Sequence, residues 1–162
     1  MTARNRHFSP TRLAQRALAC LVLSGSLVSF AFAGDTTYGT IIEVKSLDVV
    51  VLDTGTDKYT VRLIGIVAPN DPALAKKGKQ MVATLILNKW VQMRFDHRNG
   101  KDEMVSRILT IQTEKVDAKD TGEILVKAGL AKREADFDYK CGCLTNAENE
   151  ARAAKRGLWS AK

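Results

Sequence analysis

Three short β-strand-like runs, separated only by tight turns, constrain the fold of this chain more than any other feature. The runs are rich in β-branched residues and cover Tyr38–Val44, Val49–Thr54 and Lys58–Ile66. A glycine-centred turn at Asp53–Asp57 joins the second run to the third. Because strands that are linked by short turns pair with each other, the sequence predicts a three-stranded meander.

Two further β-like runs follow a helical segment. Trp90–Phe95 alternates apolar and polar side chains, and Arg107–Thr113 comes after a polar loop in which Asn99–Gly100 is a turn signal. Short, curved strands with a helix between the third and the fourth are typical of a small β-barrel. The sequence therefore predicts an α+β domain built on a five-stranded, partly open β-barrel of the OB type.

Three helices are predicted to accompany this barrel. Apolar residues at helical spacing indicate a helix over Pro72–Asn88 and a short one over Thr121–Ala128. Thr145 and Glu148 have the spacing of a capping box, which predicts that the third helix begins there. This last helix is expected to run to Arg156, before a glycine.

The N-terminal segment has the composition of an export signal. Four arginines precede an apolar run, Ala17–Phe32, that ends at the small-x-small sequence Ala31–Phe32–Ala33. We therefore expect residues 1–33 to be a signal peptide, cleaved near Ala33–Gly34, and residues 34–162 to form the domain. An uncleaved membrane anchor is the alternative, although the run is shorter than the roughly 20 apolar residues of a spanning helix. Cleavage predicts a secreted or periplasmic protein without stable membrane association.

Removal of this segment leaves a domain that is only mildly basic. The full chain has 25 Lys and Arg residues against 18 Asp and Glu residues, a formal charge of +7. Residues 1–33 hold four arginines and no acidic residue, so the domain keeps 21 basic against 18 acidic residues, or +3. Proteins that bind nucleic acid through bulk charge are usually more basic than this. Recognition of phosphate by this domain must therefore be local.

Two cysteines, Cys141 and Cys143, remain in the domain once Cys20 has left with the signal peptide. In an oxidising compartment they can close a small Cys-Gly-Cys disulfide ring. Free thiols or pairing between molecules are the alternatives. A zinc site is disfavoured, because two thiols without a second pair of ligands hold zinc poorly.

Five stretches of the domain resemble the staphylococcal nuclease family. They are Ser46–Leu52, Val61–Pro69, Arg94–Arg107, Glu123–Lys132 and Ala147–Trp159, and their order and spacing carry the resemblance. The resemblance implies an OB-fold domain that hydrolyses phosphodiester bonds in DNA and RNA, typically with Ca²⁺. It also implies DNA or RNA as the partner, with single strands favoured, and we expect the protein to be a monomer.

The resemblance assigns roles to three residues. Arg62 and Arg107 fall on the family's two catalytic arginines, which bind phosphate, and Asp48 falls on an aspartate that ligates the metal. In-line attack of water on phosphorus needs cationic donors to the phosphoryl oxygens, a metal ion and a group that orients or deprotonates the water. Guanidinium groups suit the first task because they are planar, always charged and bidentate toward phosphate.

The segment after the arginine strand departs from the family pattern. The family usually has an aspartate, a small residue, a proline and a glutamate there, but this chain reads Val67-Ala-Pro-Asn70. A metal-ligand carboxylate and the carboxylate that handles the attacking water are therefore both missing. Calcium takes about 6–8 oxygen ligands, and Asp48 would be the only carboxylate left to hold it. Asp71 is an alternative candidate for the base if the loop shifts by one residue.

Two interpretations of function follow from these residues. The first is an exported staphylococcal-nuclease-like protein that acts on nucleic-acid phosphodiesters with weakened or lost catalysis. The alternative is a non-catalytic OB-fold module that binds nucleic acid, a nucleotide or a protein partner. Phe137 and Tyr139 lie among basic residues, where they either stack on a base beside a phosphate or pack the C-terminal segment.

Overall fold

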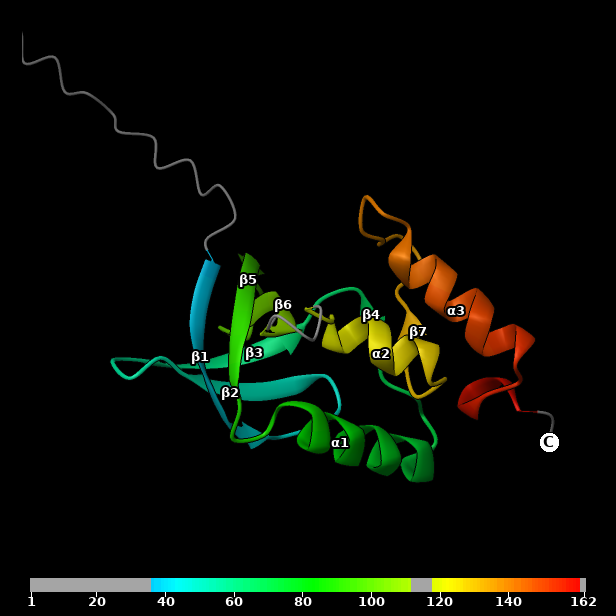
Figure 1. Ribbon diagram of the computed structural model, residues 1–162, viewed down its shortest axis with the longest axis horizontal. Coiled ribbons are helices and arrows are strands. Elements are labelled where there is room, and N and C mark those ends of the chain that lie inside the picture. The colour runs from blue at the N-terminus through cyan, green and yellow to red at the C-terminus, as the bar shows by residue number, and fades with distance from the viewer. Residues whose placement is uncertain (1–35, 112–117, 161–162) are drawn as a thin grey trace, which may run out of the picture. The chain divides into compact units, whose positions relative to one another are not determined.

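The structure is a computed structural model that describes residues 36–111 and 118–160, so the predicted signal peptide and its cleavage site lie outside it. Five strands form a closed β-barrel in the order β1-β2-β3-β6-β5 (Figure 1). Their bounds are β1 Thr36–Val44, β2 Val49–Asp53, β3 Lys58–Leu63, β5 Trp90–Arg98 and β6 Met104–Thr110. The predicted α+β fold with a five-stranded barrel is confirmed, although the barrel is closed rather than partly open.

Two pairings between strands that are distant in sequence close the barrel. β1, β2 and β3 form the predicted antiparallel meander, and β5 and β6 form an antiparallel pair. β1 then pairs with β5 in antiparallel fashion, and β3 pairs with β6 in parallel. A parallel pair needs a long connection, and helix α1, Pro72–Ile86, lies within it. β6 begins at Met104 rather than at the predicted Arg107, because Met104 already pairs with Val61 of β3.

The third strand is shorter than predicted. The expected strand over Lys58–Ile66 ends at Leu63, because Gly65 has a φ of 74° and turns the chain. The next residues form a separate strand, β4, Ile66–Val67, which pairs with β7, Lys132–Arg133, in a small two-stranded sheet. The segment with the altered family residues is therefore tied to the C-terminal part of the domain and not to the barrel.

The described residues form three α-helices, as predicted. α1 and α2, Thr121–Lys127, each begin after an aspartate that accepts hydrogen bonds from the first turn, Asp71 and Asp120 respectively. α3 spans Cys143–Ala153 and begins after a glycine, which has no side chain to cap it. No helix in the described part of the chain is long and apolar enough to cross a membrane.

The predicted capping box of α3 is wrong. Thr145 lies inside the first turn of α3, and both its N–H and its hydroxyl donate to the carboxylate of Asp138. The N–H of Leu144 donates to the other oxygen of Asp138 at 3.1 Å. The carboxylate of Glu148 instead accepts the N–H of Arg133 at 2.9 Å. A carboxylate in the preceding loop thus caps α3, which the local pattern of two helix residues does not reveal.

The core fills the inside of the barrel and extends beneath α1. Strand side chains alternate between the two faces of the sheet, and the inward ones are fully buried, including Ile41, Val61 and Ile108. α1 contributes Val82 and Ile86 to the same cluster. Full burial of each such side chain contributes about 1.5–3 kcal/mol. Because apolar side chains occupy the inward positions of the strands, the charged residues considered below lie on the outer face of the barrel.

Two glycines allow the C-terminal segment to pack against the end of α2. Gly129 follows α2, and Gly157 begins a short 3₁₀ helix, Gly157–Trp159; their φ angles are 69° and 50°. The N–H of Leu158 donates to the carbonyl of Gly129 at 2.9 Å. A Cβ on Gly129 would lie 2.2 Å from the carbonyl oxygen of Arg156, which is closer than such atoms pack. This approach requires glycine at position 129.

Gly129→Ala is expected to lower the free energy of unfolding by about 2 kcal/mol or more, because it adds backbone strain and a clash with the carbonyl of Arg156. Gly100→Ala is the matched control. A Cβ at position 100 meets nothing within 4 Å, so its effect should stay within about 0.5 kcal/mol. Urea unfolding measures both, and equal stability of the two variants would contradict the steric account.

Candidate functional site

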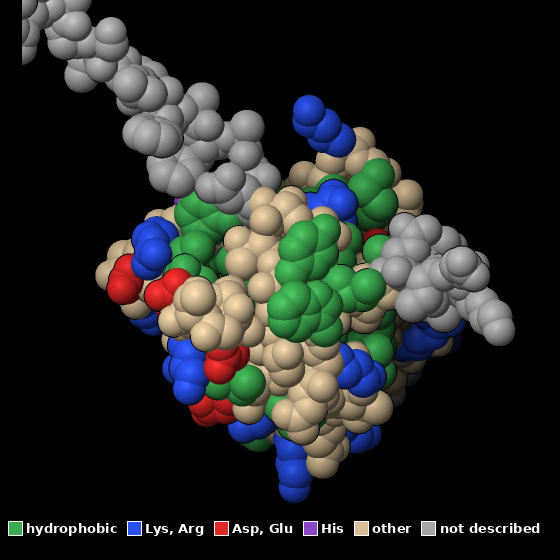
Figure 2. All heavy atoms as spheres, turned by 60° about the vertical axis from the view of Figure 1, so that its left-hand side comes forward, with side chains coloured by type: hydrophobic (Ala, Val, Ile, Leu, Met, Phe, Trp, Pro, Cys, Tyr) green, Lys and Arg blue, Asp and Glu red, His purple; other side chains and the backbone are tan. Residues whose placement is uncertain are grey.

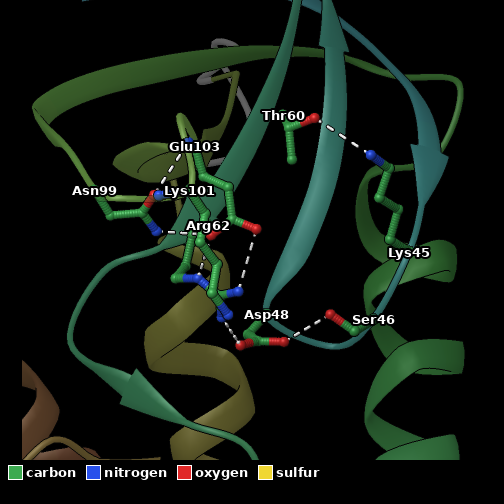
Figure 3. Close-up of polar contacts among 8 residues, drawn as sticks. All are labelled: Lys45, Ser46, Asp48, Thr60, Arg62, Asn99, Lys101 and Glu103. Atoms are coloured by element: carbon green, nitrogen blue, oxygen red, sulfur yellow. Dashed lines mark hydrogen bonds and ion pairs between the residues drawn. The ribbon is translucent and has the colours of Figure 1, made fainter.

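Arg62 lies on β3 with its guanidinium between two carboxylates (Figure 3). Its Nε donates to Oε2 of Glu103 at 2.8 Å, and its Nη2 donates to Oε1 of the same residue at 3.3 Å. Its Nη1 donates to Oδ2 of Asp48. All three nitrogens of Arg62 therefore have a carboxylate partner, and two negative charges face one positive charge.

The two carboxylates are in turn fixed by their own neighbours (Figure 3). The side-chain amide of Asn99 donates to Oε2 of Glu103 at 2.7 Å, and its oxygen accepts the N–H of Glu103 at 3.0 Å. The hydroxyl of Ser46 donates to Oδ1 of Asp48 at 2.6 Å. Hydrogen bonds from Arg62 and Asn99 lower the pKa of Glu103, and the bond to Glu103 raises the pKa of Arg62. Arg62 is thus part of a satisfied network before any ligand binds.

Arg107 lies on β6 and is held from two sides. Its Nε donates to Oδ2 of Asp120 at 2.8 Å, and its Cζ lies 3.7 Å from the ring centroid of Tyr139. Asp120 is only 4% exposed and also caps α2 by accepting the N–H of Glu123. Burial raises the pKa of Tyr139, so its hydroxyl stays protonated. Within the described part of the chain, the two Nη atoms of Arg107 make no hydrogen bond.

Arg94 stands directly opposite Arg107 in the pairing of β5 with β6. Residues in this relation project from the same face of the sheet about 5 Å apart, and like charges there repel each other. Arg94 is exposed and forms no ion pair with any described residue. A pocket of about 360 Å³ beside Arg107 is lined by two further basic residues, Lys119 and Lys127, and by two acidic ones, Asp120 and Glu123. Asp120 is already paired with Arg107, so the basic side chains outnumber the acidic ones. An anion bound at Arg94 and Arg107 would relieve the repulsion between these two guanidinium groups.

The two predicted arginines come from neighbouring strands and share one face. Arg62 pairs with Val105 in the parallel ladder of β3 and β6, and Arg107 follows two residues later on β6. Side chains two residues apart on a strand point to the same face. The structure therefore brings Arg62 and Arg107 to one surface and places the predicted metal ligand, Asp48, against Arg62.

The pocket next to Arg62 is acidic. It has a volume of about 460 Å³ and is lined by Asp96, Glu134 and Asp136 in addition to Arg62. These carboxylates add to the two that already hold the guanidinium. Because negative charge exceeds positive charge around Arg62, a phosphate is disfavoured there compared with the surface at Arg107.

The residues after β3 do not rebuild the missing carboxylate pair. Val67 lies on β4 and is 47% exposed, and Asn70 is exposed in the loop before α1. Oδ1 of Asp71 accepts the N–H of Ala73 at 2.8 Å and that of Leu74 at 3.2 Å, which makes Asp71 the N-cap of α1. Among the described residues, Asp71 forms no hydrogen bond with Arg62 or Arg107. Its role as a base stays a prediction.

The residues present do not fit a calcium ion. Calcium takes about 6–8 oxygen ligands. One oxygen of Asp48 accepts a hydrogen bond from Ser46 and the other is paired with Arg62, while Val67 has no oxygen in its side chain. Across residues 36–111 and 118–160, no group of three or more His, Cys, Asp or Glu side chains is placed to hold a metal ion.

The segment before α3 carries the cysteine pair and two aromatic rings. Cys141 and Cys143 form a disulfide, with their Cα atoms 5.2 Å apart. The rings of Phe137 and Tyr139 meet edge to face, with centroids 5.4 Å apart. Phe137 packs over Gly65, where a Cβ would lie 2.2 Å from its ring. The two rings thus pack the C-terminal segment onto the barrel, and Tyr139 in addition covers Arg107.

The sequence model of the family described as Staphylococcal nuclease homologue matches residues 60–161, which is more than half of the chain. The chain belongs to this family. The match contains both arginines, Val67 and Asn70, and begins after Asp48. A comparison with curated proteins finds no match. Membership of the staphylococcal nuclease family implies a nuclease-type or nucleic-acid-related function in general, and the family generally depends on Ca²⁺.

Three residues of the site in this staphylococcal nuclease homologue were not predicted from the sequence. Glu103 follows the turn signal at Asn99–Gly100, and Asp120 precedes a helix where aspartate is a common cap, but neither pattern indicates an ion pair. Their arginine partners are 41 and 13 residues away along the chain. In the sequence Arg94 is one polar residue of an alternating strand, and only the register of β5 with β6 reveals its charged neighbour.

Glu103→Gln is expected to change the pH dependence of stability. Because the folded protein holds the pKa of Glu103 below its usual 4.5, its contribution is complete above that pH and is lost as the pH falls through the lower folded value. The wild type should therefore exceed Glu103→Gln by about 1–3 kcal/mol at neutral pH, and this gap should close on acidification. Urea unfolding between about pH 3 and pH 7 measures it.

Asp102→Asn is the control for this experiment, because Asp102 makes only an exposed ion pair with Arg98. Its stability should follow that of the wild type across the pH range. A gap between wild type and Glu103→Gln that stays constant with pH would contradict the assignment of Glu103 as the ionised partner of Arg62.

Proposed function

We propose that this chain is an exported member of the staphylococcal nuclease family that holds nucleic acid by its phosphates and hydrolyses phosphodiester bonds weakly or not at all. One observation carries the proposal. The positions at which the family supplies two carboxylates hold Val67 and Asn70, and the remaining carboxylate, Asp48, is paired with Arg62. General-base help typically contributes about 10²–10⁴ in rate, so its loss alone would leave little turnover.

Phosphate binding is assigned chiefly to Arg107 rather than to Arg62. Only one nitrogen of Arg107 is used by Asp120, and Arg94 stands opposite it with the same charge. A phosphate that bridges these two guanidinium groups would satisfy free donors and remove a like-charge repulsion. Arg62 would first have to leave two carboxylates, which offsets much of what a phosphate contact would contribute.

A second candidate function is favoured by the acidic pocket beside Arg62. Its carboxylates, Asp96, Glu134 and Asp136, suit a cationic side chain better than a phosphate. On this alternative the domain is a non-catalytic module that binds a basic segment of a partner protein, and Arg62 has a purely structural role.

A cleavage assay with restored carboxylates tests the proposal. The protein is recovered from the periplasm or medium, and its intact mass shows whether residues 1–33 have been removed. Fluorescent single-stranded DNA and RNA are then incubated with calcium, magnesium or a chelator. The wild type should cut little, whereas Val67→Asp/Asn70→Glu should gain metal-dependent cleavage of about 10²-fold or more. Val67→Asn/Asn70→Gln, of similar size but uncharged, should gain nothing.

Two outcomes would contradict the proposal. Metal-dependent cutting by the wild type that disappears in Arg62→Ala would mean that another group, such as Asp71, supplies the base. No retention of either oligonucleotide at low salt, together with binding of a polylysine peptide, would favour the second candidate instead.

A further inference from the structure

Three large hydrophobic side chains are exposed together on the outer face of β1 and β5. Tyr38, Ile42 and Trp90 are 46%, 40% and 55% exposed. Figure 2 is turned so that the β1 side of the barrel comes forward, and it shows hydrophobic side chains gathered in a patch with Lys and Arg side chains near it. A group of neighbouring exposed apolar side chains is more often a binding site than a single exposed apolar side chain is.

The strand register places these side chains around one point. Trp90 of β5 pairs with Thr40 of β1. Tyr38 lies two residues before Thr40, so it projects from the same face. Ile42 lies at a β-bulge between Ile41 and Glu43, and its exposure places it on the outside of the barrel as well. The intervening residue Ile41 is fully buried, which confirms that this face points outward. Two aromatic rings and one aliphatic side chain thus form a small platform on the surface.

This platform is continuous with the arginine pair of the candidate site. The outward residues of β5 after Trp90 are Gln92 and Arg94, and Arg94 stands opposite Arg107. At about 3.3 Å per residue, Trp90 and Arg94 are roughly 13 Å apart along the strand. The face therefore presents two cations at one end and Trp90 at the other, and Gln92 and Tyr38 stand opposite each other between them.

We propose that Tyr38 and Trp90 stack the bases of a single-stranded nucleic acid whose phosphates are held at Arg94 and Arg107. The inference rests on the proposed function and adds the strandedness of the partner and the path it takes over the barrel. Exposed bases of a single strand have free π-faces that stack on aromatic rings, whereas the bases of a duplex do not. Glutamine between the two ends is able to hydrogen-bond to a base or sugar.

Other occupants fit this face less well. β1 is paired with β2 on one side and with β5 on the other, so no strand edge is open for pairing with a second copy of the chain. Three side chains also supply far less area than the roughly 800 Å² per partner of a stable protein interface. The carboxylate of Asp53, which stands opposite Thr40 across β1, is 4.0 Å from the ammonium of Lys58, so it already has a basic partner.

The test compares Trp90→Ala, Trp90→Phe and the wild type, all in a Trp159→Phe background so that Trp90 is the only tryptophan. Binding of an oligothymidylate of about 16 nucleotides and of a dinucleotide is measured by fluorescence anisotropy. Trp90→Ala should weaken binding of the long strand by about 5- to 100-fold and leave binding of the dinucleotide unchanged. Trp90→Phe should restore most of the affinity, and the strand should quench Trp90 fluorescence in the parent.

Four results would overturn the platform. Equal affinity of Trp90→Ala and the wild type for the long strand would remove it while leaving phosphate binding at Arg107 intact. A duplex of the same length serves as a further probe. If Trp90→Ala weakened binding of the duplex as much as binding of the single strand, Trp90 would not be stacking on bases. No binding of either probe by the wild type would overturn the platform and the proposed function together, and self-association lost in Trp90→Ala would identify a second copy as the occupant.

Discussion

The parallel pairing of β3 with β6 is the interaction on which the arrangement of this surface depends. It closes the barrel and sets Arg62 opposite Val105. Since alternate residues share a face, Glu103 and Arg107 lie on either side of Val105 and both are neighbours of Arg62. Arg62 bonds to Glu103, which leaves Arg107 to pair with Asp120 at the start of α2. One register thus decides which arginine is neutralised by its surroundings and which keeps free donors.

The two arginines therefore differ in what they can do, although the resemblance places both on the family's catalytic pair. Arg62, with carboxylates on all its nitrogens, stabilises the end of the barrel, and loss of Arg62 would leave the largely buried carboxylates of Asp48 and Glu103 uncompensated. That structural role accounts for an Asp48–Arg62 pair in a chain without the other carboxylates of the family site. Arg107 keeps two nitrogens for a ligand and faces a second cation, Arg94. On the proposed function, phosphate binding and phosphodiester cleavage are separated in this way.

Local patterns predicted most of the fold, and long-range contacts explain what they missed. β-branched runs and helical spacing gave the five strands and three helices, because these signals depend on nearby residues. The predicted end of the third strand at Ile66 and the predicted capping box of α3 were wrong. Gly65 turns the chain after Leu63, and Asp138 in the preceding loop caps α3. The candidate arginines were found by resemblance, but the carboxylate of Glu103, 41 residues from Arg62, becomes a partner only through the closure of the barrel.

The salt dependence of oligonucleotide binding tests the central claim, that Arg107 and not Arg62 holds phosphate. Arg107→Gln/Asp120→Asn removes both charges of one pair and keeps an N-cap for α2, with Asp120→Asn as its control. Arg62→Gln/Glu103→Gln, with Glu103→Gln as its control, does the same for the other pair. The account predicts that only the first double variant loses about tenfold in affinity and about one unit of slope in a plot of log affinity against log salt. An equal loss in the Arg62 variant, or none in the Arg107 variant, would contradict it.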